Sequence, residues 1–131
     1  MQKRILTSEE YNLLLDKLVK NIKHSTLFHR IKYIYGIPRG GLPIAVHLSH
    51  HLNLDFLEKF DDTVLKRSST LIVDDIAHTG RTLEKLINTY ITATLFYRDG
   101  STVEPNFYIE KTDQWIVFPW EKIDEIPNRE E

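Results

Sequence analysis

The chain has 131 residues, the length of one domain, because single domains mostly contain about 100–200 residues. Lys and Arg total 17 against 19 Asp and Glu, so the net charge is −2 and a general nucleic-acid-binding surface is not expected. The absence of cysteine excludes disulfides, thiolate metal sites and cysteine nucleophiles. Because the sequence shows neither an apolar signal core nor the ~20 apolar residues that span a bilayer, we expect a cytoplasmic protein with no membrane span.

The first part of the chain predicts a helix, a strand and a second helix. Thr7 and Glu10 form the pattern of a capping box, and apolar residues follow at helical spacing over residues 8–23. The run 33–37 is rich in β-forming residues and is followed by a proline and two glycines, which is typical of a strand that ends in a loop. Pro43 suits the first turn of a helix that continues to about Leu52.

The remainder predicts more alternating elements. Residues 71–73 form a short apolar strand of the type that is buried on both faces of a parallel sheet. Further strands are expected within 92–97 and 107–109, after a helix whose apolar positions are Leu83, Leu86, Ile87, Tyr90 and Ile91. This order predicts an α/β fold, with a mostly parallel sheet flanked by helices. Ligands of such folds bind beyond the carboxyl ends of the strands, where both unusual loops of this sequence lie.

The segment after the buried strand combines two carboxylates with a loop suited to an anion. Small and hydroxyl residues over 76–82 allow backbone amides to converge on a phosphate at a helix N-terminus, and Thr79 and Thr82 can donate hydroxyl hydrogen bonds. Asp74 and Asp75 would repel that phosphate, but they suit sugar hydroxyls or Mg²⁺ beside it. The pattern therefore indicates a phosphorylated ribose. The alternative is an ordinary turn in which one aspartate caps a helix.

The stretch from Leu71 to Thr82 resembles the phosphoribosyl pyrophosphate motif of the type I phosphoribosyltransferases: an apolar strand, two acids, a short gap and a Thr-Gly-x-Thr ending. Residues 36–42 resemble the family's pyrophosphate loop, in which a cis peptide bond lies next to the arginine, here Arg39. A plain turn is the alternative for this loop taken alone. The resemblance runs to about Glu121, and it implies the family fold, with a small hood of N- and C-terminal segments, as a single domain over residues 1–131.

The resemblance also implies roles for these residues. Asp74 and Asp75 would bind the ribose 2- and 3-hydroxyls, with Asp75 as the direct Mg²⁺ ligand. Pyrophosphate would leave against Arg39, whose guanidinium offers a planar fork of donors, and against Gly40. The other residues expected to bind phosphoribosyl pyrophosphate are Ile76, Ala77, His78, Thr79, Gly80, Arg81 and Thr82.

Residues 113–121 resemble the purine-binding segment of the family's bacterial xanthine–guanine group. The counterpart of Trp115 stacks on the base there, a contact worth about 1–3 kcal/mol, and the backbone at Ile116 meets the base edge. The alternative for Trp115 and Trp120 is that they are core or interface aromatics. Arg98 occupies the place of a lysine that contacts the 6-oxo group, or else it is a solvated arginine at a strand end.

Two features depart from the family pattern. His78 stands where the family has an aspartate at the purine N7, and a histidine can accept or donate a proton there, so we count it with Asp74 and Asp75 as a catalytic candidate. The interval 53–69 is short for the mobile loop that closes over the reacting sugar. Lys66 and Arg67 in this interval either reach the pyrophosphate or form a solvated basic turn.

These patterns predict a purine-type phosphoribosyltransferase of purine salvage. It would use Mg²⁺ to transfer ribose 5-phosphate from phosphoribosyl pyrophosphate to a guanine-, xanthine- or hypoxanthine-like base, and the family resemblance implies a homo-oligomer. Two alternatives stay open: a nucleotide-binding or regulatory module on the same fold, and a hydrolase of a related nucleotide. His47, His50 and His51 have a spacing that can bind zinc, but we interpret them as an exposed helix face because no glutamate base or third ligand accompanies them.

Overall fold

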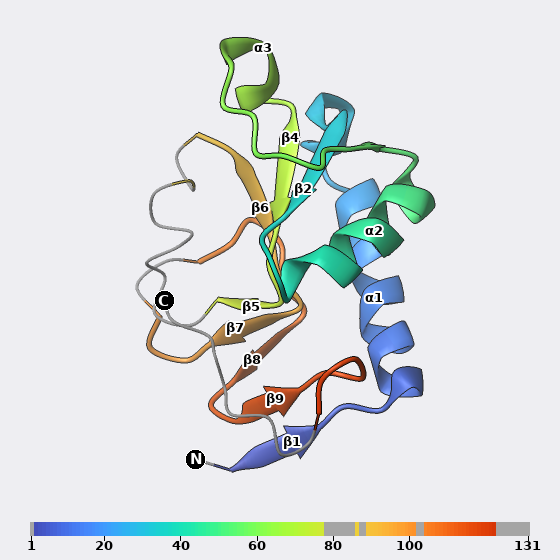
Figure 1. Cartoon of the computed structure of the whole chain (residues 1–131), viewed down its shortest axis with the longest axis vertical. Coiled ribbons are helices and arrows are strands. Elements are labelled where there is room, and N and C mark those ends of the chain that lie inside the picture. Colours follow the sequence, from blue (N-terminus) through green and yellow to red (C-terminus); the bar gives the residue numbers. More distant parts are fainter. Residues whose placement is uncertain (1, 78–85, 87–88, 102–103, 123–131) are drawn as a thin grey trace.

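The computed structural model describes residues 2–77, 86, 89–101 and 104–122, and every strand pair among them is parallel (Figure 1). The central sheet has the strand order β3-β2-β4-β6, a second sheet the order β5-β7-β8, and a third pairs β1 with β9. The elements are β1 (Lys3–Ile5), α1 (Ser8–Lys23), the 3₁₀ helix η1 (Phe28–Arg30), β2 (Tyr33–Gly36), α2 (Gly41–Leu52), β3 (Asp55–Phe56), α3 (Val64–Arg67), β4 (Thr70–Val73), β5 (Ile76–Ala77), β6 (Ile91–Ala93), β7 (Phe96–Arg98), β8 (Glu110–Thr112) and β9 (Trp115–Val117).

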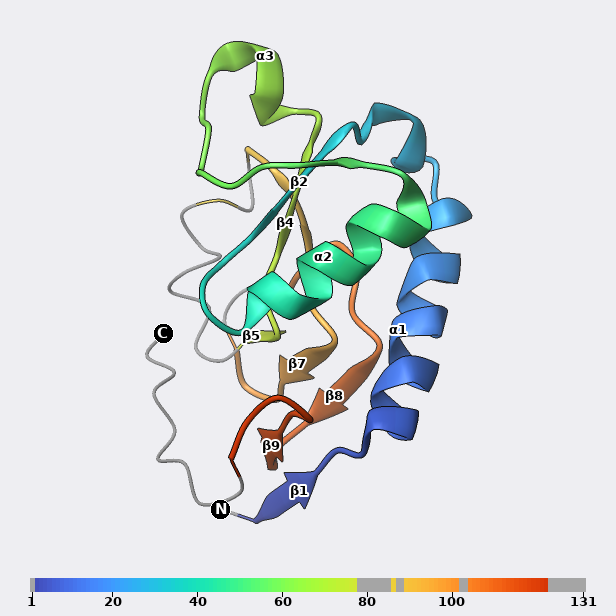
Figure 2. The ribbon, with the colours of Figure 1, turned by 45° about the vertical axis from the view of Figure 1, so that its right-hand side comes forward.

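The α/β architecture with a mostly parallel sheet is confirmed. Helices α1 and α2 lie on the same face of the central sheet (Figures 1 and 2), where the side chains of Leu18, Ile34 and Leu48 are fully buried. The two small sheets, β5-β7-β8 and β1-β9, lie below the carboxyl ends of β2 and β4, and the β1-β9 pair joins the N-terminal strand to a C-terminal one, as expected for a hood (Figure 1). No helix in the described part of the chain is long and apolar enough to cross a membrane.

Helix α1 covers residues 8–23 as predicted and begins with a complete capping box. The Thr7 hydroxyl accepts the Glu10 N–H at 3.1 Å, and the Glu10 carboxylate accepts the Thr7 N–H at 2.9 Å. That backbone hydrogen bond is the main reason why the pKa of Glu10 is lowered. Three apolar side chains of the helix, Leu14, Leu18 and Ile22, are buried at helical spacing. The capping box and the apolar periodicity therefore both predicted this helix correctly.

Replacing the cap residue should weaken the whole fold slightly. We expect Thr7→Ala to lower the free energy of unfolding by about 1 kcal/mol, because the N–H of Glu10 loses its acceptor. Urea denaturation measures this difference. Thr63→Ala is the matched control, because Thr63 also precedes a helix but makes no side-chain cap hydrogen bond, and it should cost less. Equal losses in the two variants would contradict a specific contribution from the cap.

The prediction for residues 83–97 was wrong in two places. Ile91, counted among the helical positions, is the first residue of β6, where it pairs with Leu71 of β4. Pairing with a buried parallel strand outweighs the local helical spacing here. The strand expected over 92–97 is also divided, because Thr94 and Leu95 turn the chain from the central sheet into the β5-β7-β8 sheet. Leu83 and Ile87 of the same predicted helix lie outside the described residues.

The strand expected at 107–109 begins later. Within it, Phe107 makes one parallel bridge to Ala93, and the strand itself is β8, Glu110–Thr112. The N–H groups of Ile109 and Glu110 both bond to the carbonyl of Leu95 at 3.0 and 3.2 Å. The chain therefore changes sheets at this point, just as it does at Thr94 and Leu95.

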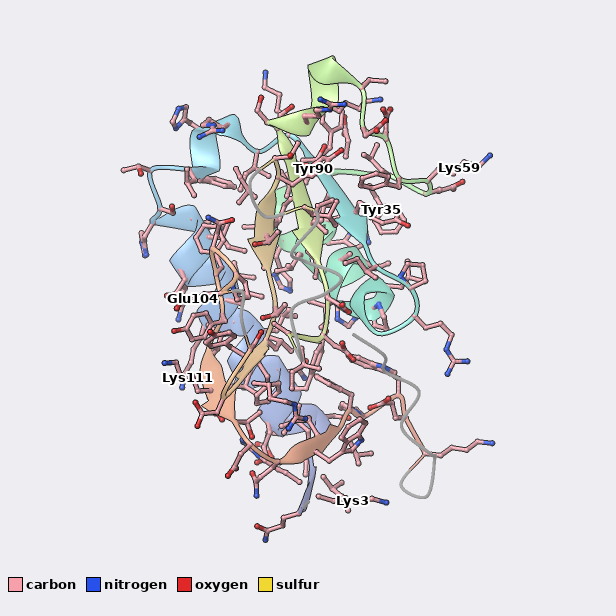
Figure 3. All side chains as sticks on the ribbon, turned by 90° about the vertical axis from the view of Figure 1, so that its left-hand side faces the viewer. Lys3, Tyr35, Lys59, Tyr90, Glu104 and Lys111 are labelled. Atoms are coloured by element: carbon pink, nitrogen blue, oxygen red, sulfur yellow. The ribbon has the colours of Figure 1, made fainter. Side chains whose placement is uncertain are left out.

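The short interval before β4 lies over the central sheet. Phe60 contacts Tyr35 and Tyr90, with ring centroids 5.6 and 5.5 Å apart, and Figure 3 shows these two tyrosines on the same face of the sheet. Asp61 pairs with Lys66 at 3.1 Å, and the backbone N–H of Thr63, together with Lys66, lowers the pKa of Asp61. These contacts fold the interval against the sheet.

Of the two interpretations of Lys66 and Arg67, the structure favours the basic turn over contact with the pyrophosphate. Both belong to α3, which lies at the amino end of β4 (Figures 1 and 2), whereas the predicted site follows its carboxyl end. A strand of four residues separates the two ends by roughly 10 Å. Lys66 binds Asp61, and the Nε of Arg67 donates to the carbonyl of Asp62 at 2.6 Å. They form the basic turn that was the alternative.

The three histidines of α2 are exposed, as interpreted from the sequence. His47 is hydrogen-bonded through Nδ1 to the hydroxyl of Tyr11 at 2.7 Å, and burial raises the pKa of that hydroxyl. Nowhere among the described residues do three or more metal-ligating side chains gather. Trp120 lies near the same place, with its ring stacked on Phe118 and edge-on to Tyr11. The pair of helices is thus joined to the C-terminal segment by aromatic contacts.

Candidate active site

The two loops that the sequence singled out lie side by side because β2 and β4 are neighbours in the sheet. Gly36, at the end of β2, pairs with Val73, at the end of β4, and the N–H of Ile37 donates to the carbonyl of Val73 at 2.8 Å. A Cβ added at Gly41 would overlap that same carbonyl. The backbone of the first loop therefore packs directly on the strand that leads to Asp74 and Asp75.

Gly40 brings the loops still closer together. A Cβ added at this residue would overlap the Oδ2 atom of Asp75, so the glycine leaves the space that the carboxylate occupies. Gly36 makes room within the first loop instead, since its Cβ would approach the carbonyl oxygen of Gly41 at 2.6 Å. Sequence reasoning assigned a binding role to Gly40 and included Gly36 and Gly41 only as parts of the loop motif. Their signal was the position of each glycine at the junction between a buried strand and a helix.

The peptide bond between Pro38 and Arg39 is cis, which is what the resemblance to the pyrophosphate loop implied. Arg39 itself is exposed. It lies immediately before Gly40, the residue that contacts Asp75. Arg39 is thus one residue away in the chain from the contact between the two loops.

The two acids are more buried than a ribose-binding role led us to expect. The side chains of Asp74 and Asp75 are 7% and 4% exposed. The carboxylate of Asp74 accepts the N–H of Asp75, and that of Asp75 accepts the N–H of Ile76, both at 2.8 Å. Gly40 packs on Asp75 from the other loop. The carboxylates therefore line the junction between the loops, and sequence spacing gave no signal of this burial.

Only part of the expected phosphate-binding loop is described. Ile76 and Ala77 form β5, which pairs with Phe96 and Tyr97 of β7, and both are fully buried. The N–H of Ile76 is used by Asp75 rather than directed to a phosphate. The predictions for the rest of the loop lie outside the described residues, namely those for His78, Thr79, Gly80, Arg81 and Thr82.

Three of the predicted base-binding residues, Arg98, Trp115 and Ile116, lie in the hood. Arg98 ends β7, and Trp115 and Ile116 begin β9. The N–H of Trp115 donates to the carbonyl of Gln2 at 2.8 Å, and the carbonyl of Val117 accepts the N–H of Leu6 at 2.9 Å. Because successive peptide groups of a strand point to opposite edges, the N–H and carbonyl of Ile116 point away from β1.

Arg98 binds the protein backbone. Its Nη1 and Nη2 atoms donate to the carbonyls of Asp113 and Gln114 at 3.3 and 3.1 Å, and its guanidinium carbon lies 5.6 Å from the centroid of the Trp115 ring. Sequence reasoning identified Arg98 and Trp115 separately but missed the acceptors. Backbone carbonyls leave no signal in a sequence.

No protein-family model and no curated protein matches the sequence. The structure is similar to a purine phosphoribosyltransferase from Pyrococcus horikoshii, with 29% identity, a TM-score of 0.77 and coverage of 98% of this chain and 100% of that one.

Two further solved structures share the fold. The xanthine-guanine-hypoxanthine phosphoribosyltransferase of Helicobacter pylori has 18% identity and a TM-score of 0.77, and 92% of this chain and 94% of that chain are covered. A hypothetical protein from Neisseria gonorrhoeae with bound ppGpp has 17% identity and a TM-score of 0.72, over 94% and 91% of the two chains.

The fold and the paired loops define a phosphoribosyltransferase-type protein. The chain shares the fold of these purine phosphoribosyltransferases, and its two loops carry the motifs that resemble the type I family.

Proposed function

We propose that the protein is a purine-type phosphoribosyltransferase that transfers the 5-phosphoribosyl group of phosphoribosyl pyrophosphate to a purine base in purine salvage. The observation that carries this proposal is the contact between Gly40 and the carboxylate of Asp75. It joins the loop expected to receive the leaving pyrophosphate to the acids expected to bind the ribose. The two parts of one substrate are bound at this junction. The similarity to purine phosphoribosyltransferases over nearly the whole chain supports the same reaction.

In the proposed reaction the bond between the anomeric carbon and the pyrophosphate oxygen breaks as a nitrogen of the base attacks that carbon. Arg39 binds the departing pyrophosphate, and Asp74 and Asp75 hold the ribose hydroxyls beneath the carbon that becomes positive. The amides of residues 77–82 and the hydroxyls of Thr79 and Thr82 would hold the 5-phosphate, and His78 would contact the base. Catalysis then consists of positioning and electrostatic stabilisation, with no covalent protein intermediate.

The described part of the protein alone offers too few ligands for Mg²⁺, and the bound phosphoribosyl pyrophosphate would have to supply the others. The described residues offer the carboxylates of Asp74 and Asp75 but no cluster of three ligands. Mg²⁺ is commonly bound by one or two carboxylates plus substrate phosphates, which is the set available here. We therefore propose that Asp75 holds Mg²⁺ once phosphoribosyl pyrophosphate is bound, and that the metal neutralises charge on the leaving group. Because Asp75 is 4% exposed, we propose that the Arg39–Gly40 backbone shifts when the substrate enters.

One assay separates this function from the alternatives. The protein is incubated with phosphoribosyl pyrophosphate, Mg²⁺ and guanine, xanthine, hypoxanthine or adenine, and both nucleotide and pyrophosphate are measured. Nucleotide formation supports transfer. Pyrophosphate without nucleotide would indicate hydrolysis, and tight binding without either product would indicate a binding module.

The proposal further includes a single domain over residues 1–131, a homo-oligomer and a cytoplasmic location. Sedimentation of the purified protein tests the oligomer.

Removing the stacking ring should weaken the binding of the base and leave the binding of phosphoribosyl pyrophosphate unchanged. We expect Trp115→Ala to raise the KM for the base about 5- to 150-fold, since stacking contributes about 1–3 kcal/mol, with little change in the KM for phosphoribosyl pyrophosphate. Steady-state kinetics with each substrate varied in turn give both values. Trp120→Ala is the control, because Trp120 packs on Phe118 and Tyr11 instead. A base KM that rises equally in both variants would remove Trp115 from the base site.

A further inference from the structure

Strand register places Arg98 where it can reach the turn that precedes Trp115. Arg98 of β7 pairs with Thr112, the last residue of β8, and Asp113 and Gln114 form the turn that follows. The side chain extends past the end of β8, so its guanidinium meets two successive carbonyls of the turn, at 3.3 and 3.1 Å. A planar group with parallel N–H donors matches this pair of acceptors, whereas an ammonium does not.

Other contacts hold the same turn, so its shape is well determined. The N–H of Gln114 donates to the Thr112 hydroxyl at 3.0 Å, and the N–H of Asp99 donates to the Thr112 carbonyl at 3.1 Å. The N–H of Trp115 is held by Gln2 of the N-terminal segment. Arg98 adds to this network a side-chain cation over the Trp115 ring, with its guanidinium carbon 5.6 Å from the ring centroid. One side of the indole is therefore occupied by the protein itself.

We propose that Arg98 is a positioning residue of the base site: it holds the Asp113–Gln114 turn and covers one face of Trp115, so that a base stacks on the opposite face. Its role is to orient the indole, and discrimination at position 6 of the purine does not depend on its charge. This inference rests on the proposed function, since it assigns the base to Trp115. It differs from the role that the family resemblance implied, a direct contact with the 6-oxo group.

Arg98→Lys separates the two roles. If Arg98 positions Trp115, lysine cannot satisfy both carbonyls, and we expect the base KM to rise about tenfold for 6-oxo and 6-amino purines alike, the effect of one lost charge-assisted hydrogen bond. The KM for phosphoribosyl pyrophosphate and kcat should stay within about twofold. Arg98→Ala should show the same pattern. Wild-type kinetics in Arg98→Lys, or a changed ratio of 6-oxo to 6-amino activity, would overturn the proposal.

A measurement without substrates tests the positioning role separately from the enzymatic activity. In a Trp120→Phe background, Trp115 is the sole tryptophan, because the chain contains two. We expect acrylamide to quench its fluorescence more strongly in Arg98→Ala and Arg98→Lys than in the parent. Unchanged quenching in both would overturn the proposal even if the enzyme is active, and increased quenching would support the positioning of Trp115 even if the wild-type protein transfers no ribose.

Lys111→Ala is the matched control for both measurements. Lys111 of β8 also places a cation over a ring, with its Nζ 5.6 Å from the centroid of Tyr97. It alternates with Thr112 along the strand and so projects from the other face of the β5-β7-β8 sheet, at the edge of the molecule in Figure 3. We expect its kinetics and its Trp115 quenching to match the parent. An effect equal to that of Arg98→Ala would mean that any loss of charge in this sheet disturbs the site, which would overturn a specific role for Arg98.

Discussion

Asp75→Asn is expected to reduce the turnover of nucleotide formation about 100- to 1,000-fold, the loss typical of removing one group that stabilises transition-state charge. The substitution removes a negative charge at the junction of the two loops, where the proposed reaction develops positive charge at the anomeric carbon. It also removes the proposed Mg²⁺ ligand. Initial rates at saturating phosphoribosyl pyrophosphate and Mg²⁺ measure the effect, and a higher Mg²⁺ requirement is expected as well.

The same substitution should leave the fold nearly intact. The Oδ1 atom of Asp75 accepts the N–H of Ile76 at 2.8 Å, and the amide oxygen of an asparagine can accept it in the same place. Urea denaturation should therefore give a free energy of unfolding close to that of the wild type, and even an increase is compatible with relief of a buried charge. Loss of activity with retained stability identifies a functional role for the carboxylate.

Asp62→Asn provides the comparison for Asp75→Asn. Asp62 is exposed, and the hydrogen bond that Arg67 makes to it uses its backbone carbonyl, so the substitution changes charge by the same amount without losing this contact. Its turnover should equal that of the wild type. If Asp75→Asn retained full turnover, Asp75 would be a buried structural acid, as its 4% exposure alone would suggest, and the proposed site would be wrong.

The parts of the structure that were predicted well have strong local signals. Helix α1 has both a capping box and a regular apolar face, and the apolar run around Leu71 is short, continuous and followed by two acids. In each case the local preference and the tertiary contacts agree, so the sequence pattern is reliable. The juxtaposition of the two loops also follows from local information, because parallel strands end at the same edge of a sheet.

The errors occur where distant residues decide the local structure. Ile91 belongs to β6 because Leu71 is available for pairing, which the helical spacing around Ile91 does not reveal. The burial of Asp75 depends on the absence of a side chain at Gly40, and the orientation of Arg98 depends on two carbonyls of a turn. A glycine that leaves space and a backbone carbonyl that accepts a hydrogen bond produce no recognisable pattern of side chains. Sequence reasoning therefore named the candidate residues but not their partners.

Gly40→Ala is expected to abolish the activity by moving the carboxylate of Asp75. Gly40 has φ −64° and ψ −30°, which alanine adopts readily, so the backbone gives no reason for a loss. The added Cβ would instead overlap Oδ2 and approach Oδ1 of Asp75 at 3.0 Å. Overpacking of this kind costs about 1–3 kcal/mol of stability, and we expect turnover to fall at least about 100-fold, as in Asp75→Asn.

A double variant shows whether the alanine acts through Asp75. If it does, Gly40→Ala combined with Asp75→Asn should be little slower than either single variant, because both remove the same interaction. Independent effects would multiply to about 10⁴-fold or more, and that result would contradict the coupling of the two loops. Gly100→Ala is the control: its φ of +88° penalises alanine by about 1–2 kcal/mol, but the Cβ meets nothing within 4 Å. It should therefore lose stability and keep its turnover, since the added Cβ contacts neither carboxylate and leaves the position of Asp75 unchanged.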